Sequence, residues 1–185
     1  MDWTSAQLTE LLDREAIRSC IARLARGEDR RDAALIGASY WPDSIIDYGV
    51  FRGDFAAYLA WVVPGADAIT NTQHVIAQSV IELNGGKTDI ETADVETQVI
   101  SYHRIDMGTG EQDIVIGGRY LDRFEQRDGE WRIAARTMLY DWFQNWGAAI
   151  DWSQGVMGMP LRAPHFSGRA RGDYSELFFA TSDRA

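Results

Sequence analysis

Hydrophobic residues recur at helical spacing near the start of the chain and alternate with polar residues over most of the rest. The apolar positions of the first stretch are Leu8, Leu11, Leu12, Ile17, Ile21 and Leu24. Steps of three and four place such side chains on one face of a helix. Thr4 and Gln7 form a capping-box pattern ahead of it. The sequence therefore predicts a helix from Ser5 to Arg26 that ends at Gly27.

Shorter elements follow this helix. The charged elbow 28–32 is expected to open a second helix that reaches Ala38 and stops before Pro42, because the residue before a proline is pushed away from helical angles. Turn residues then separate a strand at 45–51, a helix at 55–63, and strands at 74–83 and 90–105.

The stretch from Ile114 to Trp142 is the strongest fold signal. Asp128 and Gly129 are suited to the positive φ angles of a two-residue hairpin turn. In the ideal register the facing pairs are Arg127 with Glu130, Phe124 with Ile133, and Tyr120 with Thr137. A strand has a period of two, so this register assigns each side chain to a face.

One face of the hairpin then carries Ile114, Ile116, Tyr120, Phe124, Trp131, Ile133, Ala135 and Leu139. The other carries Arg119, Arg123, Arg132, Arg136, Met138, Tyr140 and Trp142. This second face changes from charged near the turn to aromatic at its far end, so the far end is expected to line a cavity. Arg136 reaches a cavity only if the cavity lies on that face or a β-bulge turns the strand.

Helices followed by antiparallel strands predict an α+β fold, in which a curved mixed β-sheet wraps around the N-terminal helices and leaves a pocket. A chain of 185 residues suits one domain, placed here at 1–147. Residues 148–185 keep many aromatics among glycine and proline, and we expect this tail to pack over the pocket or over a neighbouring subunit.

The composition of the chain limits the classes of binding partner that we expect. The net charge of −10 argues against nucleic acid and anionic membranes, while seven each of Trp, Tyr and Phe favour a pocket for a hydrophobic small molecule. With one cysteine, Cys20, predicted to be a buried structural thiol, and three histidines without metal-binding spacing, we expect no metal and no cofactor. No signal peptide or apolar span is visible, so a cytoplasmic location is expected.

The chain resembles the SnoaL-like branch of the nuclear transport factor 2 superfamily over roughly Glu15 to Trp142. The motifs that carry the resemblance are Arg14-Glu15-Ala16-Ile17-Arg18, the elbow from Gly27 to Asp32, Trp41-Pro42-Asp43, Asp47-Tyr48-Gly49, Gly53, Thr72-Gln73-His74, Gly118-Arg119-Tyr120-Leu121-Asp122 and the hairpin from Arg127 to Ile133, ending at Arg136. Their order and spacing are more specific than any single motif.

The resemblance implies a cone-shaped fold, often dimeric, and cofactor-free lyases such as bile-acid dehydratases, scytalone dehydratase and hexachlorocyclohexane dehydrochlorinase. It implies an Asp–His pair at Asp29 and His74, with Arg136 and Tyr48 as further site residues. A tyrosine that the dehydratases carry on the first helix has no counterpart, since Leu24 stands there. The expected substrate contacts are Tyr120, Met138, Tyr140, Trp142 and Trp61.

Each site residue has a structural alternative. His74 could be a polar contact at a sheet edge, Asp29 a helix N-cap, and Arg136 the partner of Asp122 or Glu125 on an exposed face. Histidine is the natural base near neutral pH, and a carboxylate on its other nitrogen would fix the tautomer. His103 is expected at the surface or an interface, or as a pocket acid, and His165 is expected to be structural.

The sequence thus predicts a lyase that dehydrates a hydrophobic hydroxylated aromatic or polycyclic compound, as a homodimer or homotrimer. Alternatives within the fold are a deformylating carbon–carbon lyase that converts lignin-derived diarylpropanes to stilbenes, and a ketosteroid-isomerase-like enzyme with Asp29 as base. The non-enzymatic alternatives are a non-catalytic subunit, like the β subunits of ring-hydroxylating dioxygenases, and a small-molecule binding protein.

Overall fold

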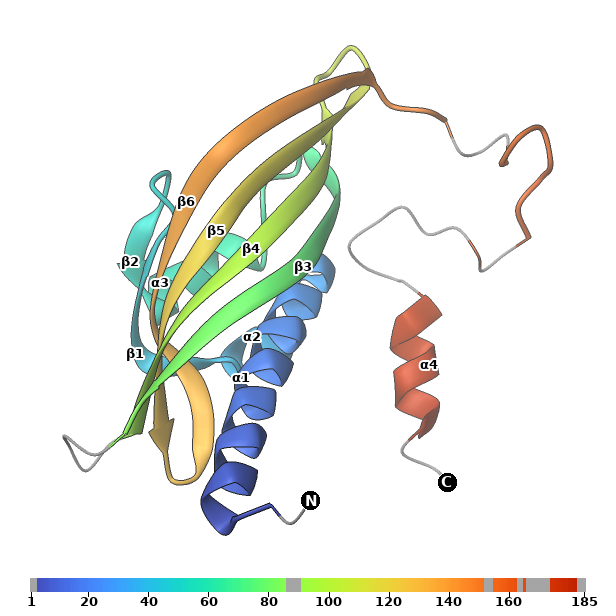
Figure 1. Cartoon of the computed structure of the whole chain (residues 1–185). Coiled ribbons are helices and arrows are strands. Elements are labelled where there is room, and N and C mark those ends of the chain that lie inside the picture. The colour runs from blue at the N-terminus through green and yellow to red at the C-terminus, as the bar shows by residue number, and fades with distance from the viewer. Residues whose placement is uncertain (1–2, 86–90, 152–154, 163–164, 166–173, 183–185) are drawn as a thin grey trace.

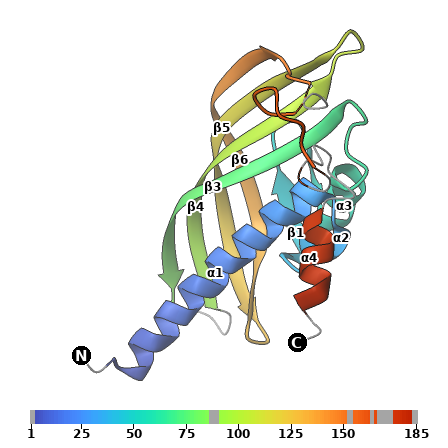
Figure 2. The ribbon, with the colours of Figure 1, turned by 90° about the vertical axis from the view of Figure 1, so that its right-hand side faces the viewer.

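Three N-terminal helices lie on one face of a curved, six-stranded sheet (Figures 1 and 2). The computed structural model describes residues 3–85, 91–151, 155–162, 165 and 174–182. The sheet has the strand order β2-β1-β6-β5-β4-β3 and is mixed, because β1 runs parallel to β6 while the other neighbours are antiparallel. The predicted α+β class, with a curved mixed sheet around N-terminal helices, is confirmed.

The strands are β1 (Tyr40–Asp47), β2 (Arg52–Asp54), β3 (Ile69–Asn84), β4 (Glu91–Asp106), β5 (Glu111–Arg127) and β6 (Glu130–Ala148). Helix α3 (Phe55–Val62) lies where the sequence predicted it. Several boundaries differ from the prediction. Strand β1 starts within the segment that was expected to end a helix, β2 lies where a turn was expected, and β3 starts five residues before the predicted His74.

The first helix, α1 (Ser5–Arg30), continues past its predicted end at Gly27. The capping box of Thr4 and Gln7 is present at its start. Gly27 serves close packing, because a Cβ at this position would lie 3.0 Å from Cγ1 of Ile36. That isoleucine belongs to α2 (Ala33–Gly37), so the missing side chain lets the two helices approach.

Helix α1 ends at Arg30 and is capped by Arg31, which has a left-handed backbone with φ of 49°. Asp32 caps α2 through hydrogen bonds from the backbone N–H groups of Ala34 and Leu35. The alternative in which Asp29 caps the second helix is therefore wrong, and Glu28 and Asp29 both belong to the last turn of α1.

The β5–β6 hairpin keeps the predicted pairing beside its turn, where Phe124 faces Ile133. Beyond this pair the register shifts, because Arg123 faces Ala135 and Ala134 is an extra residue. Tyr120 consequently faces Met138 rather than Thr137.

The bulge at Ala134 moves Arg136 and Met138 to the inner face, where both are buried. Leu139, which the ideal register grouped with Phe124 and Ile133, is 36% exposed on the outer side. The face assignment of the ideal register is therefore wrong for β6 from Ala135 to Tyr140, and the bulge that was the condition for turning Arg136 inward is present.

A second shift lies near Gly117, which faces Trp142, while Gly118 faces Tyr140. The extra residue, Asp141, carries Trp142 to the outer face. A Cβ on Gly117 would lie 2.0 Å from Cε2 of Trp142, so the indole rests directly on the glycine backbone.

The main core fills the space between α1 and the sheet. Its fully buried members include Ile17, Leu24, Ile36, Tyr40, Phe124 and Ile133. Cys20 is 1% exposed in this core, and burial raises the pKa of its thiol, as expected for a structural cysteine.

The C-terminal segment contains α4 (Tyr174–Ser182), and Arg26 of α1 donates a hydrogen bond to the Ser175 hydroxyl at 3.3 Å. Much of the predicted tail lies outside the described residues, and its packing over a pocket stays a prediction. None of the helices in the described ranges is both long and apolar enough to cross a membrane.

Candidate active site

A cavity of about 230 Å³ opens between the inner face of the sheet, the C-terminal end of α1 and α3. Aromatic and apolar side chains supply most of its wall. Polar groups enter it mainly where α1 meets β3 and β4, from Glu28, Thr72, His74, Ser101 and His103. The cavity is therefore an apolar pocket with its polar groups gathered on one side, a pattern typical of small-molecule sites.

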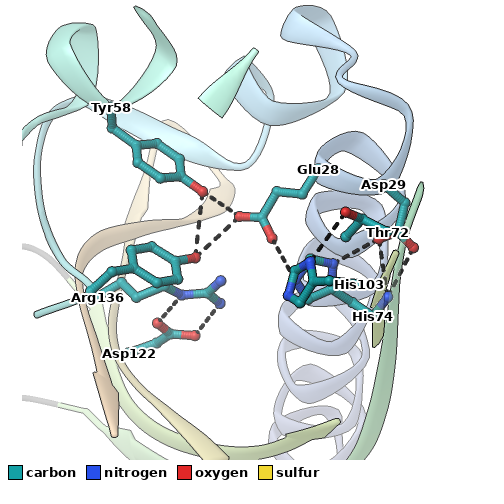
Figure 3. Close-up of polar contacts among 9 residues, drawn as sticks. Glu28, Asp29, Tyr58, Thr72, His74, His103, Asp122 and Arg136 are labelled. Atoms are coloured by element: carbon teal, nitrogen blue, oxygen red, sulfur yellow. Dashed lines mark hydrogen bonds and ion pairs between the residues drawn. The ribbon is translucent and has the colours of Figure 1, made fainter. Parts of the chain in front are cut away.

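Asp29 and His74 are in direct contact at this polar side (Figure 3). The distance between Oδ1 of Asp29 and Nδ1 of His74 is 2.7 Å. The same carboxylate accepts the backbone N–H of His74, at 3.0 Å to Oδ1 and 3.1 Å to Oδ2. This contact orients the imidazole, and it assigns the proton of Nδ1 to the bond with Asp29 while Nε2 points away from it.

The end of α1 is fixed to the start of β3, and this holds the pair in place. Arg31 donates to the backbone oxygens of Pro64 and Ile69, each at 2.7 Å. Because β3 begins at Ile69, residue 74 lies well inside a paired strand, where it faces Ser101 of β4. Both members of the pair therefore come from rigid elements.

Glu28 is a polar group of the cavity that sequence reasoning did not select. It is 7% exposed, and its Oε1 accepts hydrogen bonds from the hydroxyls of Tyr58 at 2.5 Å and Tyr48 at 3.2 Å. Its Oε2 lies 3.8 Å from Nε2 of His74. The imidazole is therefore flanked by a carboxylate at each ring nitrogen (Figure 3).

The signal for Glu28 was its place beside Asp29 in the charged elbow. Glu28 was missed because, in a helix that ended at Gly27, the direction of the Glu28 side chain would have been undefined. Tyr58 gave a weaker signal, since an aromatic residue on a short helix is more often a core residue.

The two carboxylates raise the pKa of His74. Burial alone would lower it, but the hydrogen bond to Asp29 and the negative charges of Glu28 and Asp29 more than offset that effect. Burial, followed by the charge of Glu28, raises the pKa of Tyr48 and of Tyr58 well above the ordinary value. Both phenols therefore stay protonated and act as hydrogen-bond donors.

His103 lines the cavity instead of lying at the surface. Its ring meets that of His74 edge to face, with centroids 6.2 Å apart, and its Nδ1 lies 3.3 Å from the Thr72 hydroxyl. Burial and the neighbouring His74 lower the pKa of His103 to about 4. The surface expectation is wrong, and His103 is a neutral pocket histidine at physiological pH.

Arg136 is fully buried and forms two hydrogen bonds of 2.7 Å with Asp122. Its guanidinium lies 3.8 Å from the centroid of the Tyr120 ring. Tyr120 lines the cavity and Arg136 does not, so the arginine lies behind the wall. Asp122 is the predicted partner, but the pair lies in the interior rather than on an exposed face.

Four of the five predicted substrate contacts line the cavity: Tyr120, Met138, Tyr140 and Trp61. Tyr140 also donates a hydrogen bond to the backbone oxygen of Tyr48 at 2.9 Å. Trp142 does not line the cavity, because the bulge at Asp141 turns it outward. Leu24, at the position where the dehydratases carry a tyrosine, is fully buried in the core.

Comparison with solved structures places this fold among known ones. A putative scytalone dehydratase from Novosphingobium aromaticivorans aligns with a TM-score of 0.64 and 19% identity, covering 76% of this chain and 93% of its own. The type 3 hexachlorocyclohexane dehydrochlorinase LinA from Novosphingobium barchaimii also has a TM-score of 0.64, with 18% identity and coverage of 85% and 99%. A nuclear transport factor 2-like protein from Salmonella enterica aligns at 0.57 with 14% identity, covering 72% and 94%.

At these identities the likeness shows the fold, which is the nuclear transport factor 2-like cone. No curated protein gives a significant match to the sequence. A family model described as the SnoaL-like domain matches residues 9–137, which includes both carboxylates, His74 and Arg136. The chain belongs to the SnoaL-like domain family.

Proposed function

We propose that this protein is a cofactor-independent lyase that dehydrates a hydrophobic, hydroxylated aromatic or polycyclic small molecule, with His74 as the base. The observation that carries the proposal is the Asp29–His74 contact of 2.7 Å at the polar side of an aromatic cavity. A carboxylate on Nδ1 stabilises the imidazolium that forms when Nε2 takes a proton.

The shape and lining of the cavity support this substrate class. Tyr48, Trp61, Tyr120 and Tyr140 offer flat apolar surfaces to an aromatic ring. A negative charge near His74 would be repelled by Glu28 and Asp29, because Arg136 is already paired with Asp122 and the cavity-lining guanidinium of Arg31 is bound to backbone oxygens of Pro64 and Ile69. We therefore expect an uncharged compound whose hydroxyl group reaches His74.

Tyr48 and Arg136 have indirect roles in this proposal. Tyr48 binds Glu28 and forms part of the wall, so it positions the acidic group. Arg136 and Asp122 fix the Tyr120 ring from behind through a cation–π contact. Neither residue has to touch the leaving group.

The experiment that tests the function is a mass-spectrometric screen of the purified protein against neutral hydroxylated steroids and lignin-type diaryl alcohols. We expect one compound to lose water, and His74→Ala to slow that reaction by about 100- to 10,000-fold, the range for a lost acid–base group. Glu130→Gln, at the exposed hairpin tip, is the matched control and should turn over normally.

Other results would identify a different function. Loss of formaldehyde would indicate the deformylating lyase, and a product of unchanged mass would indicate the isomerase. Undiminished turnover by His74→Ala would contradict the assignment of His74 as base. Tight binding without turnover by both proteins would favour the binding-protein alternative.

A further inference from the structure

The two oxygens of the Glu28 carboxylate are in different surroundings. Oε1 accepts both tyrosine hydroxyls, and Oε2 faces Nε2 of His74 (Figure 3). Tyr58 comes from α3 and Tyr48 follows β1, so two elements besides α1 hold this carboxylate.

The distance of 3.8 Å between Oε2 and Nε2 is too long for a hydrogen bond, yet short enough for one oxygen atom to bind both. An oxygen placed about 2.8 Å from each atom would satisfy both contacts. A substrate hydroxyl at this point would be within reach of an acid and of a base together.

Charge counting supports a single shared proton. Asp29 and Glu28 flank one imidazole, so one proton carried by either His74 or Glu28 leaves the three groups with a net charge of −1. Around them, Arg136 is paired with Asp122, and Arg31 is bound to backbone oxygens of Pro64 and Ile69.

Arg26 and Arg30, two cationic side chains of α1, line a second depression together with Asp29 and His74. The other groups that face this cluster are neutral near pH 7. Burial keeps the pKa of His103 at about 4, so its ring is uncharged. Tyr40, Tyr48, Tyr58 and Tyr120 are buried phenols near Glu28, and burial raises the pKa of each. Among these groups, His74 is the one whose raised pKa makes it titrate near neutral pH, and its Nε2 faces Oε2 of Glu28.

We propose that Glu28 is the catalytic acid of this site and that it shares one proton with the base, His74. This inference rests on the proposed dehydration. In the reactive form His74 is neutral at Nε2 and Glu28 carries a proton on Oε2. His74 takes a proton from carbon, the electrons of that C–H bond form the new C=C bond, and the C–O bond breaks with its electron pair on oxygen.

The leaving oxygen takes the proton of Glu28 and departs as water. His74 is then an imidazolium and Glu28 a carboxylate, with Nε2 and Oε2 facing one another. Transfer of the proton from Nε2 to Oε2 restores the starting form. The site thus regenerates itself without an external acid or base, and no oxidant or cofactor is consumed.

The test uses the whole chain and two readouts. The first follows the His74 ring by NMR during a pH titration of the wild type, Glu28→Gln and Glu130→Gln. We expect Glu28→Gln to move the His74 midpoint to lower pH, and Glu130→Gln to leave it unchanged. An unchanged midpoint in Glu28→Gln would overturn the proposal, even if no substrate were known.

The second readout is the pH dependence of turnover with the compound found in the screen. If the active form carries the shared proton, the wild-type rate falls as pH rises through the His74 midpoint. A rate that rises through that midpoint would overturn the proposal, because it would show that neutral His74 acts without an acid on Glu28.

Glu28→Gln should lose about 100-fold in turnover and retain its affinity for the compound. Glu28→Asp keeps a titrating group and should retain more activity than Glu28→Gln, and it serves as a second variant if the glutamine protein folds poorly. Equal activity of Glu28→Gln and the wild type would contradict the acid role. A lowered midpoint together with no lyase activity would separate failure of the proposed function from failure of the proton sharing.

Discussion

The Asp29 carboxylate binds His74 twice, through the ring Nδ1 at 2.7 Å and through the backbone N–H at 3.0 Å. One side chain therefore fixes both the tautomer of the imidazole and the position of its strand. Two different substitutions of Asp29 can therefore distinguish the loss of the charge beside the ring from the loss of the hydrogen bond to the backbone.

Replacing Asp29 with asparagine should remove the charge beside the ring while a side-chain oxygen still accepts the backbone N–H. We expect activity to fall by about 100-fold or more, with the free energy of unfolding changed little. Asp29→Ala should lose similar activity and also about 1–3 kcal/mol of stability, because the buried N–H is left unpaired. Urea unfolding of both variants, compared with turnover, tests this, and equal stability of the two would contradict the backbone role.

Replacing only one member of the buried ion pair between Arg136 and Asp122 should lower the stability of the protein strongly. Arg136→Met leaves an unpaired carboxylate in the interior, and we expect a loss of about 3–5 kcal/mol in the free energy of unfolding. The double variant Arg136→Met/Asp122→Leu should recover part of that loss, because neither charge remains buried alone. Additive losses in chemical denaturation would show that the pair does not act as a unit.

The stability of the protein should depend on the protonation of His74. Its pKa is raised in the folded state, since burial is outweighed by the hydrogen bond to Asp29 and the charges of Glu28 and Asp29. The protonated ring therefore contributes stability that is fully present below its unfolded pKa of about 6.5 and is lost as pH rises through the higher folded value.

The measurement is the difference in unfolding free energy between the wild type and His74→Gln across that range. The wild-type advantage should shrink as pH increases above about 6.5. A growing advantage would mean that the folded-state pKa of His74 is lowered, contrary to the effect of its two carboxylates.

Trp61 and Trp142 should differ in their effect on substrate binding. Trp61 lines the cavity, whereas Trp142 lies on the outer face against Gly117. We expect Trp61→Ala to raise KM by about tenfold, equivalent to about 1.4 kcal/mol of lost contact. Trp142→Ala should leave KM unchanged, and a similar rise for both would contradict the outward placement of Trp142.

The sequence was sufficient for elements defined by local chemistry. The capping box at Thr4, the turn at Asp128 and Gly129, and helix α3 depend on residues that contact one another within a few positions. The family motifs added the order of these elements and the pairing of Asp29 with His74. The fold class followed from these signals.

The sequence was insufficient where packing decided the outcome. Glycine often ends a helix, but Gly27 packs closely against Ile36, and helix α1 continues through it. The direction of Glu28 depended on that continuation, so this residue could not be placed in the cavity beforehand. The partners of the Glu28 carboxylate come from α3, from the residue that follows β1 and from β3, which no local pattern connects.

Bulges were the other source of error. The residue types around Ala134 do not distinguish a regular strand from one with an extra residue, so Met138 and Leu139 were assigned to the wrong faces. The burial of Arg136 could be stated only as a conditional outcome. A second bulge at Asp141 returns Trp142 to the outer face, so it does not join Met138 and Tyr140 in the cavity wall.

The bulge at Ala134 makes the inner wall depend on backbone register rather than on side-chain identity. If Ala134 were instead paired in a regular ladder, no catalytic group would be lost, yet the following residues of β6, up to the second bulge, would move to the opposite face. Arg136 would then point to solvent, Asp122 would stay buried without its partner, and Thr137 would face Tyr120 in place of Met138. The lining of this pocket is therefore set by one backbone bulge, and deleting Ala134 would preserve that lining, because Ala135 already faces Arg123 and Met138 already faces Tyr120.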